Sequence, residues 1–242
     1  LSFGGFWPSS YSNDLFALDG SAPSRWKLLR AANPPSPRAA HSMVLDARRH
    51  RLLLFGGSVM LGAAPDSAVY ALSLEPPYEW TCLETEGPRP PATYFHAAGY
   101  DAGRDRMLIH SGFAQLGGGP PADDVWELSL TRPPTRRQLP IAGRRPSLRG
   151  GHGGVYDPIA DQFVILGGWV ADFGDVANDC WTLSADSIPT WTKRADIGAF
   201  FRGSTDFAFP TLTYDTARHR VVAFRTGGYP TWTLFGRASS GG

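Results

Sequence analysis

Three histidines recur in the sequence at nearly constant spacing. His41, His96 and His152 stand 55 and 56 residues apart, and each precedes an aspartate by five positions. Imidazole nitrogens are common zinc ligands, so three histidines brought together would form a metal site. The corresponding position in the last copy of the pattern is Pro210. We therefore predict no metal ion and no other cofactor.

A second set of candidates contains arginines placed near the same histidines. A guanidinium group binds carboxylates through paired hydrogen bonds, so arginines gathered around one channel would hold an acidic ligand or a sugar. The alternative is that each arginine ties its own loop to a neighbouring part of the fold. The sequence leaves both interpretations open. The candidate ligand-binding residues are Arg38, Tyr94, Arg149, Arg202 and Asp206.

Motifs typical of catalysis are absent from the sequence. It contains no nucleophile elbow, no HExxH motif and no phosphate-binding loop. The acidic pair Asp123-Asp124 lies ahead of an expected strand, where a carboxylate commonly belongs to a turn. The sequence alone does not assign Cys82 and Cys180, which are 98 residues apart, to a disulfide. We therefore expect a protein that is not an enzyme.

The histidines belong to a unit that repeats along the chain. Its aspartate recurs as Asp46, Asp101, Asp157 and Asp215, at steps of 55, 56 and 58 residues. Nine residues after each of the first three aspartates an apolar run ends, and two small residues follow. These pairs are Gly56-Gly57, Ser111-Gly112 and Gly167-Gly168, with Gly4-Gly5 in the same place at the start of the chain.

Two further signals keep the same register. An aromatic residue stands two positions before a leucine in each unit, as Phe16, Tyr70, Trp126, Trp181 and Trp232. Ten residues later the first, second and fourth copies have Trp26, Trp80 and Trp191, whereas the third has Arg136. Apolar and polar residues alternate around these signals, which is typical of half-buried strands. Each complete unit therefore predicts four short strands, here called a to d in chain order.

This pattern resembles the kelch repeat, a β-propeller blade with a period of roughly 50 residues. The resemblance implies an all-β fold, a β-propeller of four-stranded kelch-type blades with about five blades represented. The first copy lacks strand a and the last lacks strand d, so we expect either further blades or an imperfectly closed ring. A single propeller would cover residues 1–242, with blade segments 1–30, 31–85, 86–140, 141–195 and 196–242.

The resemblance also places the loops that could bind a partner. The b–c and d–a loops emerge on one face of such a propeller, and function is often located on loops held by a rigid scaffold. The b–c loops 58–67, 113–122 and 169–177 vary in sequence and carry several large side chains. These side chains either form a binding rim or cap the ends of the blades. The candidates are Met60, Phe113, Gln115, Trp169 and Phe173.

The amino-acid composition argues against several classes of protein. The 242 residues include 28 glycines, 21 prolines and 12% aromatic residues, which argues against a disordered or a mostly helical chain. The formal net charge of +1 gives no electrostatic case for nucleic acid. Arginine accounts for all basic residues except Lys27 and Lys193, a bacterial-like composition. No apolar run is long enough for a membrane span, and no signal peptide is present in the sequence given, so we expect a soluble domain.

These observations lead to two functional hypotheses. The first is a non-catalytic binding module that presents loops to a protein or peptide partner. The second is a protein that binds a sugar or an acidic small molecule, or a mutarotase-like enzyme, with an arginine-lined central channel. The kelch resemblance permits both.

Overall fold

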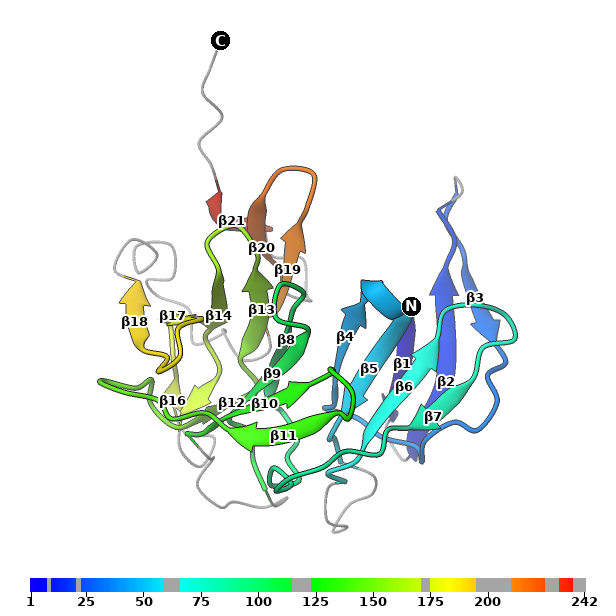
Figure 1. Ribbon diagram of the computed structural model, residues 1–242. Helices are drawn as coiled ribbons and strands as arrows, with labels where there is room; N and C mark the ends of the chain where they lie inside the picture. The colour runs from blue at the N-terminus through cyan, green and yellow to red at the C-terminus, as the bar shows by residue number, and fades with distance from the viewer. Residues whose placement is uncertain are drawn as a thin grey trace.

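The protein is described by a computed structural model that covers residues 1–7, 10–20, 23–58, 66–114, 123–170, 175–194, 210–224 and 231–236. These residues form β-strands joined by turns, with one short 3-10 helix, η1 (Ala47–Arg49), between two strands (Figure 1). Within the described ranges, no helix has the length and apolar character needed to cross a membrane.

Three of the repeat units form complete four-stranded antiparallel sheets. Each runs in chain order from an inner strand to an outer one, because consecutive strands are joined by hairpins. The second sheet contains β4 (Ser42–Asp46), β5 (Arg51–Phe55), β6 (Val69–Ser73) and β7 (Trp80–Cys82). The third contains β8 (Ala97–Asp101), β9 (Arg106–His110), β10 (Val125–Ser129) and β11 (Thr135–Gln138). The fourth contains β13 (Gly153–Asp157), β14 (Gln162–Leu166), β17 (Cys180–Ser184) and β18 (Trp191–Arg194).

The two terminal sheets have three strands each, as the sequence predicts. The first sheet lacks an inner strand a and contains β1 (Ser2–Trp7), β2 (Ser10–Leu18) and β3 (Trp26–Leu29). The fifth sheet contains β19 (Thr211–Asp215), β20 (Arg220–Phe224) and β21 (Trp232–Gly236), and no outer strand d is found among the described residues. The structure therefore confirms the predicted fold class, including the incomplete first and last units.

One small sheet was not predicted. It pairs β12 (Arg149–Gly150), β15 (Trp169–Val170) and β16 (Asp175–Val176), all from the loops of the fourth unit. Two-residue strands carry no alternation of polar and apolar residues that a sequence pattern could reveal. This small sheet fixes the position of Trp169 on the face where the b–c and d–a loops emerge.

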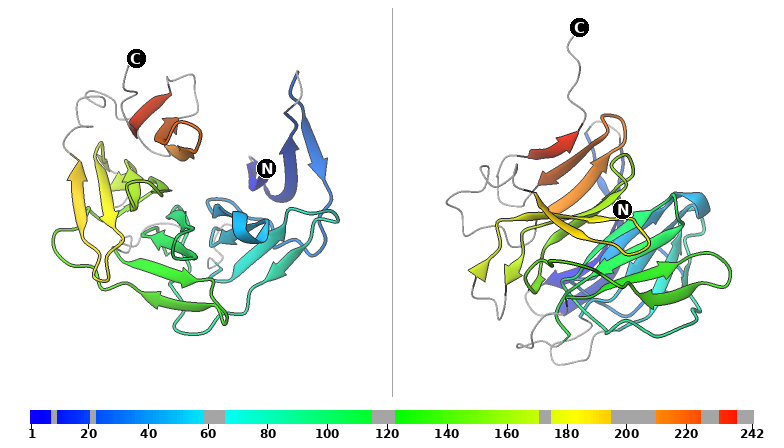
Figure 2. Two further views of the ribbon diagram at one scale, coloured as in Figure 1. Left: turned by 45° about the horizontal axis from the view of Figure 1, so that its top comes forward. Right: turned by 60° about the vertical axis from the view of Figure 1, so that its left-hand side comes forward.

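The five main sheets follow one another in an arc around a common axis (Figure 2). Their inner strands β4, β8, β13 and β19 lie next to each other around that axis. In the view along the axis, the arc of described residues is open between the first and the fifth sheet (Figure 2, left). The second, third and fourth sheets therefore have a neighbouring sheet on both sides, whereas the first and fifth sheets have one each.

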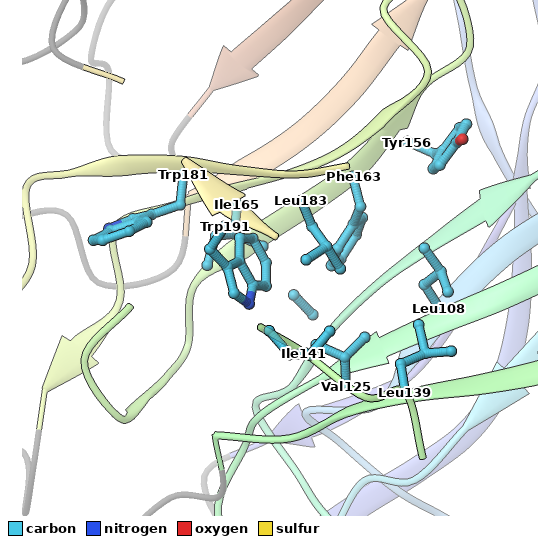
Figure 3. Packing of buried hydrophobic residues seen from close by; sticks show 11 residues of the cluster. Leu108, Val125, Leu139, Ile141, Tyr156, Phe163, Ile165, Trp181, Leu183 and Trp191 are labelled. Atoms are coloured by element: carbon cyan, nitrogen blue, oxygen red, sulfur yellow. The ribbon is translucent and has the colours of Figure 1, made fainter. Parts of the chain in front are cut away.

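Apolar side chains fill the space between neighbouring sheets. Figure 3 shows the cluster between the third and fourth sheets, where Leu108 and Val125 face Phe163, Leu183 and Trp191. Similar clusters join the other three pairs of neighbours. Because side chains alternate between the two faces of a strand, each inner sheet is buried on both faces. The aromatic and leucine signals of strands c and d mark the face that packs on the preceding sheet.

The glycine pair that ends strand b is required by the next sheet along the arc. Gly56 has a φ of +67°, and a Cβ atom there would lie 2.3 Å from the carbonyl oxygen of Thr93 in the third sheet. The neighbouring Gly57 donates its N–H to the same oxygen at 2.9 Å. Glycine adopts the left-handed conformation without strain and leaves room for this close approach, whereas the third unit places Ser111 at the same position with a φ of +60°.

Arginine–aspartate clamps link the sheets at the opposite face, where strands a and b are joined. Arg49 of the second sheet binds both carboxylate oxygens of Asp105 in the third, at 2.8 and 2.6 Å. Arg104 of the third sheet binds Asp161 of the fourth in the same way, with both distances 2.7 Å. Each arginine lies three residues after the aspartate of its own unit and contacts that aspartate too.

Candidate functional site

Arg38 is fully buried and its guanidinium group is bound within its own blade. It donates to the backbone oxygens of Ser36 and Gly56, at 3.1 and 3.0 Å. Its remaining nitrogen binds the Ser36 hydroxyl at 2.9 Å and the Asp66 carboxylate at 3.3 Å. The guanidinium also lies over the Tyr70 ring, 5.0 Å from its centroid. Such a side chain holds the d–a segment against the end of strand b.

Arg149 repeats this arrangement in the fourth blade. Its side chain has no exposed surface and donates to the backbone of Ser147 and Gly167 and to Asp179. Burial alone would raise the pKa of Asp179, but the hydrogen bond and charge of Arg149 outweigh it and the pKa is lowered. The two arginines therefore occupy separate blades and bind their own b–c segments, which favours the structural interpretation over a shared ligand site.

Tyr94 and Phe113 lie together in the interior. Their exposed fractions are 1% and 0%, and their ring centroids are 5.9 Å apart. The backbone N–H of each residue also donates to the carbonyl oxygen of the other. Phe113 also fills the space beside Gly150, where a Cβ atom would lie 2.0 Å from the Phe113 ring. Phe113 thus closes the end of a blade and offers no surface to a partner in this conformation.

Five other candidates lie outside the described residues. These are the ligand-binding candidates Arg202 and Asp206 and the loop candidates Met60, Gln115 and Phe173.

An axial cavity of about 380 Å³ runs between the inner strands. Among the described residues, its lining contains aliphatic side chains, small residues and three tyrosines, but no arginine. Leu45, Val155 and Leu212 are typical of the lining. The described lining of this cavity is therefore mainly apolar and uncharged, in contrast to the arginine-lined channel considered from the sequence.

The three repeated histidines connect neighbouring sheets. His41, His96 and His152 each stand edge-on to the ring that precedes the small-residue pair of the preceding sheet, with ring centroids 5.0–5.7 Å apart. His96 also shares a hydrogen bond of 2.7 Å with the Ser42 hydroxyl of the second sheet. Burial lowers the pKa of His96 to about 3, so its ring is neutral at pH 7. No group of metal-ligating side chains is found in the described part of the chain.

The junction of the third and fourth sheets contains a histidine pair. His110 takes the place that Phe3 and Phe55 hold in the earlier sheets, and its Nδ1 lies 2.9 Å from Nε2 of His152. Burial lowers the pKa of His110 to about 3, with Arg149 as the next cause. Burial also lowers the pKa of His152 well below its usual value. Both rings are therefore neutral at pH 7, and one nitrogen donates while the other accepts.

The loop face presents a half-buried aromatic pair beside a shallow cavity. Trp169 of β15 stands edge-on to Phe95, with ring centroids 5.9 Å apart. Phe95 belongs to the d–a turn, where its φ is +58°, and its backbone bonds to Ala40 and Gly151 of the neighbouring turns. Phe95 also lines a cavity of about 230 Å³ together with the three repeated histidines.

This arrangement defines the candidate site, here called the Trp169 rim: Trp169, Phe95 and the cavity beside them. It offers an aromatic surface of fixed orientation next to neutral imidazole rings. The geometry suits contact with an apolar or aromatic side chain of a partner.

Comparison with protein families identifies the repeat. The family model described as the KLHDC2/KLHL20/DRC7 Kelch-repeats domain matches residues 1–206. The chain belongs to the kelch-repeat family. The structure called YjhT has the same fold, with a TM-score of 0.69 and 14% sequence identity. The match covers 96% of this kelch chain and 75% of that chain.

Two curated relatives contain a similar kelch segment. The flagellar outer arm dynein alpha chain of Chlamydomonas reinhardtii is 33% identical over 169 residues, which cover 64% of this chain and 4% of that protein. Serine/threonine-protein phosphatase BSL2 of Arabidopsis thaliana is 32% identical over 157 residues, which cover 63% of this chain and 15% of that protein. The kelch chain thus spans a small part of both relatives.

Trp169 was among the candidates from the sequence, whereas Phe95 was not. No repeated residue type marks the position of Phe95, because the neighbouring kelch units have Ala40 and Gly151 there. Asp66 and Asp179 were also missed as partners of the arginines. They lie 28 and 30 residues beyond Arg38 and Arg149, so only the folded b–c segments bring them together.

Proposed function

We propose that this kelch domain is a non-catalytic protein-interaction module whose Trp169 rim binds a protein or peptide partner. The observation that carries the proposal is the aromatic pair of Trp169 and Phe95 beside a cavity on the loop face. Trp and other aromatic residues are enriched among the side chains that dominate the binding energy of protein interfaces.

The surroundings of the rim support this role. Phe95 is held by backbone hydrogen bonds to two neighbouring turns, and Trp169 is held by the pairing of β12, β15 and β16. A pre-positioned aromatic surface loses little conformational entropy on binding. The two described arginines that the sequence offered as ligand-binding candidates, Arg38 and Arg149, are already bound within their blades. A partner is therefore recognised mainly by shape and apolar contact.

The test compares Trp169→Ser with the unchanged chain. Both proteins are immobilised, and bound polypeptides are quantified by mass spectrometry and then measured singly by surface plasmon resonance. We expect the Kd of a bound partner to rise by roughly 30-fold or more, the size of an interface hot spot of about 2 kcal/mol. Thermal unfolding of each variant establishes that the fold is retained.

The matched control is Ile159→Ser. Ile159 is also apolar and is more exposed than the half-buried Trp169, but it lies in the turn between strands a and b, at the opposite end of the blade. We expect binding by this variant to equal that of the unchanged chain. Loss of binding on changing Ile159, with binding retained by Trp169→Ser, would place the interface on the other face and refute the proposal.

A further inference from the structure

The d–a segment ahead of β12 presents an exposed serine preceded by two arginines. Ser147 is exposed, and Arg144 and Arg145 stand three and two residues before it. The Ser147 hydroxyl oxygen accepts a bond of 2.9 Å from Arg149. Within the described residues, the hydrogen of this hydroxyl has no acceptor. An exposed serine of this kind acts as a nucleophile once a base removes that hydrogen.

The second sheet shows that the link between serine and arginine needs no basic residues ahead of it. Ser36 accepts bonds from Arg38 through its hydroxyl and its backbone oxygen, at 2.9 and 3.1 Å, as the serine of the fourth sheet does. The residues three and two positions before Ser36 are Asn33 and Pro34. The arginine pair of the fourth sheet is therefore not explained by this local structure.

Both arginines of the pair lie at the surface in weak contacts. Arg144 is exposed, and its guanidinium group lies over the Trp181 ring, 5.7 Å from the centroid. Arg145 binds Asp123 at 3.2 Å, and these two side chains are 34% and 47% exposed. Ion pairs as exposed as this one contribute little to stability. Both guanidinium groups can therefore exchange these contacts for the carboxylates of another protein.

We propose that Ser147 is phosphorylated by a serine/threonine kinase whose acidic groove selects arginines three and two residues before the serine. Guanidinium groups bind carboxylates through paired hydrogen bonds, and kinases distinguish substrates by such charge patterns. The Ser147 oxygen attacks the γ-phosphorus of ATP, the bond from that phosphorus to the β–γ bridging oxygen breaks, and ADP leaves. The hydroxyl hydrogen passes as a proton to the catalytic aspartate of the kinase.

The added phosphate lies next to a buried and fully engaged arginine. One terminal nitrogen of Arg149 donates to the Gly167 carbonyl oxygen and to Asp179, at 3.0 and 2.7 Å, and the other donates to Ser147. A phosphate group carries a charge of about −1.5 to −2 at pH 7 and binds guanidinium groups through two parallel bonds. It competes with Asp179 for Arg149 and repels the Asp179 carboxylate. Phosphorylation therefore releases Arg149 from Asp179.

Arg149 also belongs to the small sheet that fixes Trp169. In this sheet Arg149 pairs with Val170, and Gly150 pairs with Trp169. A shift of Arg149 therefore loosens β12 against β15. Through this link, phosphorylation weakens partner binding at the Trp169 rim, a consequence that rests on the proposed function. The phosphorylation itself and the loosening of the small sheet do not rest on it.

The experiment treats the full chain with ATP, Mg²⁺ and the catalytic subunit of cyclic-AMP-dependent protein kinase, which selects serines preceded by arginines. Mass spectrometry locates and quantifies the phosphate. We expect phosphate on Ser147 and none on Ser36. Arg144→Gln should lower the initial rate at Ser147 at least five-fold. The matched control Arg48→Gln, which changes an exposed arginine next to the a–b turn, should leave that rate unchanged.

A peptide of residues 141–151, treated in parallel, separates the two ways in which the proposal can fail. If the peptide is modified and the full chain is not, the fold withholds Ser147 and the proposal is overturned. If neither is modified, the segment is not a substrate for such a kinase, and the proposal is overturned as well. Equal rates in Arg144→Gln and the unchanged chain would refute selection by the arginines.

Hydrogen exchange of the phosphorylated full chain tests the structural effect. We expect the amides of β12 and β15 to exchange at least ten-fold faster than in the unmodified chain, and those of β4 to β6 to be unchanged. Ser147→Ala should exchange alike before and after kinase treatment. Equal exchange in the phosphorylated and unmodified chains would refute the release of Arg149. These measurements use no binding partner, so their outcome is independent of the Trp169→Ser test.

Discussion

At the scale of single residues, charged side chains at the a–b turns join one sheet to the next. Asp46 has no exposed side-chain surface and accepts bonds from Arg49 and Arg51, while Arg49 continues to Asp105. The bond from Arg49 holds the pKa of Asp105 at about 2. Removing one partner from a buried ion pair costs more than the pair itself contributes, because the other charge is left unpaired.

The two clamps differ in exposure, which gives a prediction. Arg49→Met leaves Asp105, whose side chain is 10% exposed, without its cation, and we expect a loss of about 2–3 kcal/mol in the free energy of unfolding. Arg104→Met leaves Asp161, whose side chain is 53% exposed, and water replaces the lost bonds, so we expect less than about 1 kcal/mol. Urea unfolding of the two variants measures the difference. Equal losses would contradict the importance of burial.

At the scale of elements, the junction between the fourth and fifth sheets lacks a clamp. Ala160 occupies the arginine position, and His219 occupies the aspartate position. His219 has the same left-handed backbone as Asp105 and Asp161, with φ values of 49°, 52° and 52°. The hydroxyl of Tyr214 is buried without a hydrogen-bond partner among the described residues, whereas Tyr100 binds Asp105.

Installing the missing clamp should stabilise the last sheet. We expect the double variant Ala160→Arg with His219→Asp to gain about 1 kcal/mol, because the new carboxylate accepts from both the arginine and Tyr214. Hydrogen exchange of β19 and β20 amides measures the gain locally. The single variant Ala160→Arg is the control and should gain nothing. Equal protection in both variants would show that the clamp has not formed.

The strands of the five main sheets could be predicted from the sequence because their units repeat the same signals, whereas the two-residue strands β12, β15 and β16 carry none. The glycine pairs, the aromatic–leucine pairs and the d-strand tryptophans fixed three complete sheets and two incomplete ones. The roles of Arg38 and Arg149 could not be predicted in the same way. Whether an arginine points into the channel or back to its own blade depends on carboxylates that lie about 30 residues away in the chain. Phe95 was missed because its position carries no repeated residue type.

At the scale of the whole molecule, neutral histidines lie between several pairs of sheets. Burial lowers the pKa of His41 to about 4 and that of His96 to about 3, compared with 6.5 for an exposed imidazole. Between about pH 3 and pH 6.5, the unfolded chain therefore binds more protons than the folded one. The contribution of these histidines to the free energy of unfolding is fully present above about pH 6.5. It declines as the pH falls toward 4, because unfolding is then coupled to proton uptake.

This linkage predicts the effect of removing one histidine. His96→Asn should lower the free energy of unfolding at pH 7, because the Phe55 contact is lost, but it should reduce the slope below pH 6.5. Each fully buried histidine contributes at most about 1.4 kcal/mol per pH unit to that slope. Urea unfolding from pH 7 to pH 4.5 measures it. The same slope in the variant and the unchanged chain would show that His96 does not titrate on unfolding.

The carboxylates act in a separate pH window. The pKa of Asp105 and that of Asp161 are lowered to about 2 by their arginines, so their contribution is present above about pH 4 and is lost on further acidification. Measurements above pH 4.5 therefore report mainly on the histidines.

The clamps also bear on how such a chain can change its number of repeats during evolution. Every clamp points the same way along the chain, with a donor toward the next sheet and an acceptor toward the previous one. If the third unit were deleted in register, Arg49 would meet Asp161 in place of Asp105, and the linkage would survive. Duplication of a whole unit would likewise join donor to acceptor at both new borders. A one-directional link of this kind lets gene segments be gained or lost without new interface chemistry.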